Sequence, residues 1–199
     1  KMEPIHEEKY RRLTIKIYQD DNPCEGPRDW DNFGKMICFH PRYNLGDKHD
    51  MSKEELLETV QREDVIALPL FLLDHSGLWM RTGRFECDAQ GWDTSHVGYI
   101  YVEHETIKKE FGKKKITEVL IHKAEGILEK EVETYSDHLE GNVWGYVIED
   151  DEENHIESCW GYYGNYEEHC LKEAKSIVDH ITEKGKANAV GQYLLPNLI

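Results

Sequence analysis

The sequence predicts an α+β fold: a mainly antiparallel sheet of about six strands packed against one long amphipathic helix, with shorter helices beside it. Short apolar or alternating segments outnumber helical ones, and most are joined by turns or short loops, which is typical of antiparallel pairing. One long segment repeats apolar residues every three or four positions, as a helix lying on a sheet does. No repeat or linker divides the 199 residues. We therefore expect one globular domain over residues 11–199 behind a flexible tail, residues 1–10.

The expected strands follow from local hydrophobicity. In the first, Leu13, Ile15 and Ile17 alternate with polar residues, which indicates one buried face. Residues 64–74 are almost continuously apolar and indicate a buried strand, with Pro69 at an edge or a bulge. The expected strands are residues 12–19, 34–40, 64–74, 78–81, 97–102, 143–148 and 156–163.

The expected helices follow from capping residues and periodicity. Ser52 and Glu55 have the spacing of a capping box, which begins a helix that ends near residue 63. A short helix follows over residues 105–111. The long helix covers residues 116–139 and ends before a Gly-Asn pair. A last helix begins at Asn165, and the apolar end of the chain should dock on the body.

Two long polar loops and a turn carry the candidate metal ligands. Asp29 and Asp31 are two residues apart, so an extended backbone points both carboxylates to one side, as calcium or magnesium would require. Cys38 and His40 have the same spacing on a strand. They could bind zinc together with Asp74 or His75 from the turn, or with His96, if the loops converge. The full candidate set is Asp29, Asp31, Cys38, His40, Asp74 and His75. The alternatives are hydrogen-bonded Asx turns, a core thiol and a structural histidine.

The two loops and the turn also share a composition rich in Asp, Trp, His and Gly. We therefore expect residues 20–32, with Trp30 at their centre, to be ordered by contacts with the turn at 74–77 and the loop at 82–96. The second loop contributes Asp88 and Trp92.

No residue pattern identifies a catalytic site. The chain has no G-x-S-x-G nucleophile motif and neither of the common glycine-rich nucleotide-binding motifs. Catalysis is therefore assigned to no residue, and we expect a protein that is not an enzyme more than one that is.

Charge gives the clearest functional signal. The net charge of −16 argues against direct binding of duplex nucleic acid, which needs a basic surface, and is compatible with a basic partner. Eleven acidic residues and a single lysine lie between residues 129 and 157. The expected partner-binding residues are Glu129, Glu133 and Asp137 along one helical stripe, and Glu149, Asp150, Asp151, Glu152 and Glu153 at a hairpin tip. The alternative is a solvated acidic face. A basic run at residues 108–115 makes the chain a charge dipole, which could also serve homo-oligomerisation.

Cysteine usage and hydropathy indicate the compartment. The five cysteines have no C-x-x-C spacing, and an odd number favours free thiols. The chain has no apolar run near 18 residues and no apolar leader, so we expect a cytoplasmic protein that does not cross a membrane.

Several strings over residues 12–164 resemble an uncharacterised family of small acidic proteins from bacteriophages and mobile elements. The most distinctive are Cys-Phe-His-x-Arg-Tyr-x-Leu-Gly-Asp at 38–47, Leu-Pro-Leu-Phe-Leu-Leu-Asp-His-Ser-Gly at 68–77, Val-Gly-Tyr-Ile-Tyr-Val at 97–102 and Ser-Cys-Trp-Gly-Tyr-Tyr-Gly at 158–164. The chain departs from that family's pattern at residues 87–98, where it has extra residues. The resemblance implies a mobile-element setting, in which small acidic proteins often inhibit host defence as anti-CRISPR proteins or DNA mimics.

These observations lead to two hypotheses. The first is an anti-CRISPR-like inhibitor in the host cytoplasm, whose acidic surface binds a basic, nucleic-acid-binding groove of a host nuclease or effector. The second is a metal-dependent hydrolase of phosphoesters, with zinc, calcium or magnesium held by the loop residues.

Overall fold

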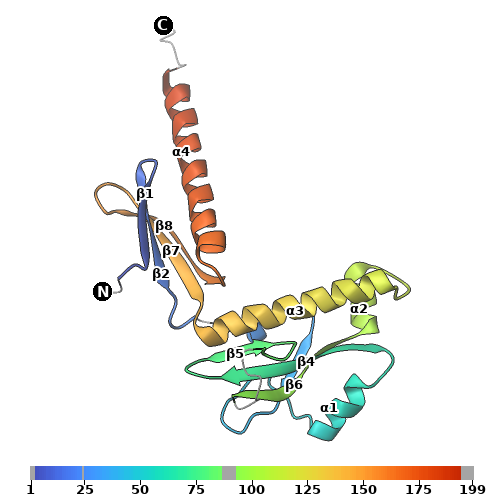
Figure 1. The fold of residues 1–199 in the computed structure, drawn as a ribbon. Helices are drawn as coiled ribbons and strands as arrows, with labels where there is room; N and C mark the ends of the chain where they lie inside the picture. Colours follow the sequence, from blue (N-terminus) through green and yellow to red (C-terminus); the bar gives the residue numbers. More distant parts are fainter. Residues whose placement is uncertain (1–2, 24, 87–92, 194–199) are drawn as a thin grey trace. The chain divides into compact units, whose positions relative to one another are not determined.

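The computed structural model describes residues 3–23, 25–86 and 93–193, with side chains described as far as residue 183 (Figure 1). By its internal contacts the chain forms two compact units. The terminal unit joins Lys1–Pro23 to Gly141–Ile199, and the central unit is Cys24–Glu140. The fold class is α+β, as expected. The prediction of one sheet of about six strands was wrong, because the strands form two four-stranded antiparallel sheets.

In the terminal unit the strand order is β1-β2-β7-β8, and every neighbouring pair is antiparallel. The strands are β1 (His6–Tyr10), β2 (Leu13–Gln19), β7 (Val143–Glu149) and β8 (His155–Tyr163). The blue N-terminal strands therefore lie beside the orange β7 and β8 in Figure 1. Helix α4 (Lys172–Tyr193) follows a π-helical turn at Glu167–Leu171, and its Ala174 and Val178 share one core with Ile15 and Ile148.

Strand β1 lies in the segment that was expected to be a flexible tail. Its backbone pairs with β2 from His6 opposite Ile17 to Tyr10 opposite Leu13. The segment His-Glu-Glu-Lys-Tyr has no apolar alternation, so its sequence gave no strand signal. Tyr10 packs against the core, the His6 ring contacts Tyr166, and Glu8 pairs with Lys175 of α4. These contacts and the backbone pairing with β2 order this strand.

In the central unit the strand order is β3-β6-β4-β5, again antiparallel throughout. The strands are β3 (Lys35–Cys38), β4 (Val65–Asp74), β5 (Leu78–Arg81) and β6 (Thr94–Glu103). The helices are α1 (Lys53–Val60), α2 (His104–Phe111) and α3 (Glu118–Glu140), with a 3-10 turn η1 at Pro27–Asp29. Alternate residues of β3 and β6 face opposite cores: Met36 and Ile100 pack toward α3, and Ile37 and Tyr101 pack against Leu56 of α1.

Local sequence signals predicted most of the helices, but the last begins at Lys172, after the π-helical turn, and not at Asn165. The buried apolar side chains of α3 are expected ones, Leu120, Ala124, Leu128, Val132 and Tyr135, and the polar Ser136 is buried with them. The capping box also forms, because the Glu55 backbone N–H donates to Ser52 Oγ and the Ser52 N–H donates to the Glu55 carboxylate. Within the described residues, no helix has the length and apolar character needed to cross a membrane.

Candidate functional site

The expected metal ligands do not converge on one point. Several of them instead form hydrogen bonds within their own loops. Asp29 accepts a hydrogen bond from the Gly26 N–H at 3.0 Å and closes the turn before η1, while Asp31 is exposed. Cys38 is buried, which raises the pKa of its thiol to about 12. Nδ1 of His40 accepts hydrogen bonds from two backbone N–H groups, those of Arg42 and Tyr43.

The turn residues belong to a different polar cluster. Asp74 accepts hydrogen bonds from the Arg42 guanidinium and from the Tyr43 hydroxyl, whose ring stacks on His40. Nδ1 of His75 lies 3.1 Å from Oδ2 of Asp93. The described residues contain no group of three or more His, Cys, Asp or Glu side chains that could hold a metal ion. His40 and Asp74 thus share neighbours, but the six predicted ligands do not form one site.

Arg28 orders the loop that the sequence placed at the centre of the molecule. Its side chain is only 7% exposed and donates to both carboxylate oxygens of Asp47, at 2.7 and 3.0 Å, and to Glu131 of α3 at 3.1 Å. Glu131 in turn accepts from the backbone N–H groups of Phe33 and Gly34. Burial acts to lower the pKa of Arg28, but its hydrogen bonds with the two carboxylates outweigh burial and raise that pKa.

Trp30 therefore packs differently from the prediction. Its side chain is 46% exposed and lies beside Pro27 and Ile127 at a shallow cavity of about 340 Å³ against α3. Among the described residues the loop is tied to α3 and Asp47, not to the turn at 74–77. Asp88 and Trp92, which were expected to contribute from the second loop, lie outside the described residues.

The acidic stripe on α3 is smaller than the sequence indicated. Glu129 is exposed and forms no ion pair with any described residue, but Glu133 pairs with Lys130. Asp137 is half-buried and interacts with other residues. Glu131, between the members of the stripe, is the buried partner of Arg28.

The β7–β8 hairpin, in the terminal unit, is a separate acidic surface. Two of its carboxylates are neutralised across the sheet, Glu149 by Lys16 and Asp151 by Lys9. Asp150 accepts hydrogen bonds from the N–H groups of residues 152 and 154 and from the Asn154 side chain, which lower its pKa. Glu152, Glu153 and Glu157 are exposed and form no ion pair within the described residues. We call these three carboxylates the hairpin acidic surface.

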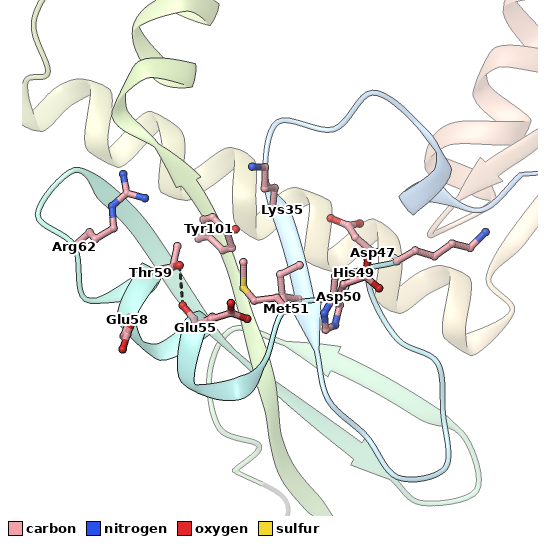
Figure 2. Close-up of a pocket in the computed structure, with 12 residues that line it drawn as sticks. Lys35, Asp47, His49, Asp50, Met51, Glu55, Glu58, Thr59, Arg62 and Tyr101 are labelled. Carbon is pink, nitrogen blue, oxygen red and sulfur yellow. Dashed lines mark hydrogen bonds between the residues drawn. The ribbon is translucent and has the colours of Figure 1, made fainter.

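A groove that the sequence did not indicate lies between α1 and strands β3 and β6 (Figure 2). It has a volume of about 1010 Å³, and we call it the α1 groove. Charges of both signs line it, together with the ring of Tyr101 and the apolar Met51 and Ile37. Its size is within the range of small-molecule and peptide sites.

No family model, no curated protein and no solved structure matches this chain. The function is therefore inferred from the geometry of the described residues.

Neither the role of Arg28 nor the α1 groove was identified from the sequence. Only the role of Arg28 had an indication there. Arg28 is the only cation between Asp20 and Asp31, and a single arginine among so many carboxylates could have been predicted to pair with them. Nothing in the sequence predicted the α1 groove, because its walls come from segments that are adjacent only after β3 and β6 pair.

Proposed function

We propose that this chain is a non-enzymatic binding protein whose hairpin acidic surface docks on a basic surface of a partner protein. The observation that supports the proposal is the selective neutralisation of the hairpin: Glu149 and Asp151 are paired with lysines, while Glu152, Glu153 and Glu157 keep their charges exposed. Like charges held together at a tip repel one another, and a basic partner relieves that repulsion. Strand β8 is also the outermost strand of its sheet, so the surface lies at a sheet edge.

We further propose that the partner is a nucleic-acid-binding component of a host defence system, so that the protein acts as an anti-CRISPR-like inhibitor. A basic groove that binds phosphates attracts a cluster of carboxylates by the same electrostatics. The resemblance to phage and mobile-element proteins points to host defence as the setting. The metal-dependent hydrolase hypothesis has no comparable support from the described residues, because they form no ligand cluster.

A competition experiment tests this function. Binding of a labelled duplex DNA to a panel of RNA-guided effector complexes and restriction nucleases is measured by fluorescence anisotropy, with and without the protein. We expect the protein to displace DNA from at least one of them. A variant with Glu152→Lys, Glu153→Lys and Glu157→Lys should lose this effect.

The matched control carries the same change of net charge elsewhere. Glu54→Lys, Glu63→Lys and Glu110→Lys alter three exposed carboxylates of the central unit that form no ion pair with described residues. This control should displace DNA as the parent does. Equal loss in both triple variants would show that only net charge matters, and no displacement from any member of the panel would refute the inhibitor function.

A further inference from the structure

Tyr101 lines the α1 groove with a hydroxyl group that has no partner in the described part of the chain. The residue is 3% exposed, and its hydroxyl has no hydrogen-bond partner among the described residues. A buried tyrosine hydroxyl usually has one. The oxygen is also not among the fully enclosed polar atoms that lack a partner, so its open side is the groove that Tyr101 lines. Burial raises the pKa of Tyr101, which keeps the hydroxyl protonated and able to donate.

Lys35 lines the same wall of the groove as Tyr101. In the pairing of β3 with β6, Lys35 is directly opposite Tyr101, so the two side chains leave the sheet on the same face. Lys35 is exposed and forms no ion pair with any described residue, and Figure 2 shows it beside Tyr101 at the groove. A free ammonium and an unpartnered hydroxyl on the same face of the sheet provide two donors for an anionic ligand group.

Some of the other charged side chains that line the groove form ion pairs or hydrogen bonds, and others do not. Arg62 is held by Asp64 and Glu103, Asp47 by Arg28, and Glu55 by the Ser52 N–H. Two lining carboxylates, Asp50 and Glu58, form no ion pair or hydrogen bond with the described residues. Lys48, a second exposed lysine that lines the groove, also forms no ion pair with the described residues. Among these described residues the groove thus has two free cations, an unpartnered hydroxyl and free carboxylates along its walls.

We propose that the α1 groove binds a small amphoteric ligand, whose carboxylate or phosphate group contacts Lys35 and Tyr101 and whose amine contacts Asp50 or Glu58. The two ends of such a ligand match the two kinds of free group in the groove. A purely anionic ligand would meet the free carboxylates, and a purely cationic one would meet Lys35. This site is independent of the hairpin acidic surface, since all of its residues belong to the central unit.

Four probes separate the chemical requirements. The protein is titrated, by NMR or calorimetry, with O-phosphoethanolamine, triglycine, inorganic phosphate and ethanolamine. The first two carry an anion and an amine, and they differ in whether the anion is a phosphate or a carboxylate. The last two each lack one end. We expect at least one amphoteric probe to bind at least tenfold more tightly than either single-ended probe, and the tighter of the two identifies the anion.

Variants assign the contacts. Tyr101→Phe removes only the hydroxyl, which has no partner to lose, so its melting temperature should stay at or above that of the parent. The same variant and Lys35→Met should each weaken the amphoteric probe by about tenfold, as the loss of a hydrogen bond to a charged group predicts. Asp50→Asn with Glu58→Gln should weaken the amphoteric probe but not inorganic phosphate.

The control is Lys109→Met, an exposed lysine of α2 that does not line the groove. It should bind like the parent. The proposal is overturned if neither amphoteric probe binds, if the single-ended probes bind as tightly, or if Tyr101→Phe keeps the parent affinity.

Discussion

At the scale of single residues, Arg28 orders a loop rich in carboxylates by pairing with Asp47 and Glu131. Its planar fork satisfies Asp47 with two hydrogen bonds and reaches Glu131 with a third nitrogen, and it also donates to the Gly34 carbonyl. Lysine has a single ammonium and cannot reproduce this geometry.

Replacement of Arg28 should therefore be costly. Arg28→Met leaves the half-buried carboxylates of Asp47 and Glu131 without their counterion. We expect a loss of about 3 kcal/mol in the free energy of unfolding, at the low end of the range for buried ion pairs. Urea denaturation measures it. Arg28→Lys should recover only part of the loss, and Arg84→Met, at an exposed arginine, should change little. Parent-like stability in Arg28→Lys would contradict the role of the fork.

The cysteines allow a second test at this scale. Burial raises the pKa of both Cys38 and Cys170 to about 12, whereas Cys159 is exposed on β8. At pH 8 a thiol with such a pKa is ionised in only about one molecule in 10,000, and the thiolate is the reactive form. Iodoacetamide followed by peptide mass spectrometry should label Cys159 in the folded protein, and Cys38 and Cys170 only after unfolding. Equal labelling of all three would contradict the buried cores.

At the scale of elements, an irregularity in the β7–β8 ladder positions Trp160. The register shifts between Trp144 and Tyr146, and Gly161 on the partner strand has a left-handed φ of +82°. The Trp160 ring then lies over Gly145, where an added Cβ would come within 2.2 Å of a ring carbon. One face of the partly exposed Trp160 ring therefore packs on the backbone of Gly145. Any larger residue at position 145 would collide with the ring.

Gly145→Ala should displace the ring and cost about 1–3 kcal/mol, as overpacking does. In a Trp160→Ala background the same substitution should cost less, because the atoms that it meets are gone. The four unfolding free energies of this cycle give the coupling. A cost that is unchanged in the double variant would show that the ring is not the obstacle.

The hairpin turn has a predictable response to pH. Hydrogen bonds from Asn154 and from the Glu152 N–H hold the pKa of Asp150 below its ordinary value of 3.8. A lowered carboxyl pKa contributes stability above that ordinary value, and the contribution is lost as the pH falls through the folded-state pKa. Asp150→Ala should therefore be less stable than the parent at pH 7, and the difference should shrink below about pH 3.8. Urea denaturation at pH 7 and below about pH 3.8 checks this. The control is Glu152→Ala, since this exposed side chain forms no ion pair with the described residues. A difference independent of pH would contradict the role of ionised Asp150.

At the scale of the whole molecule, the negative charge is divided between two units that carry separate acidic surfaces. The α3 surface is partly neutralised by Lys130 and Arg28, while the hairpin acidic surface is not. Exposed charges act mainly on encounter with a partner, over a Debye length of about 8 Å at physiological ionic strength.

Association kinetics with any nuclease or effector from which the protein displaces DNA should reflect this division. Reversal of Glu152, Glu153 and Glu157 to lysine should lower the association rate about tenfold or more and change the dissociation rate less. Glu129→Lys with Glu133→Lys should leave the rates nearly unchanged. Both effects are read by stopped-flow or surface plasmon resonance at several salt concentrations. A larger effect of the α3 pair would move the binding surface to that helix.

The sequence by itself determined the local elements. The capping box at Ser52, the apolar face of α3 and the strand alternation at Leu13–Gln19 depend on residues a few positions apart, so they can be recognised without the fold. The antiparallel α+β class followed from them.

Only the tertiary structure decided which strands pair, which charges remain free and where a ligand could bind. Lys16 neutralises Glu149 from 133 positions away, and Arg28 reaches Glu131 across 103 positions. Similarly, the α1 groove exists because β3 pairs with β6 and sets Lys35 beside Tyr101. Periodicity describes one segment at a time and contains no information on such partners, so the same carboxylates that appeared in the sequence as ligands or as a binding face became, in part, the buried and paired groups of the fold.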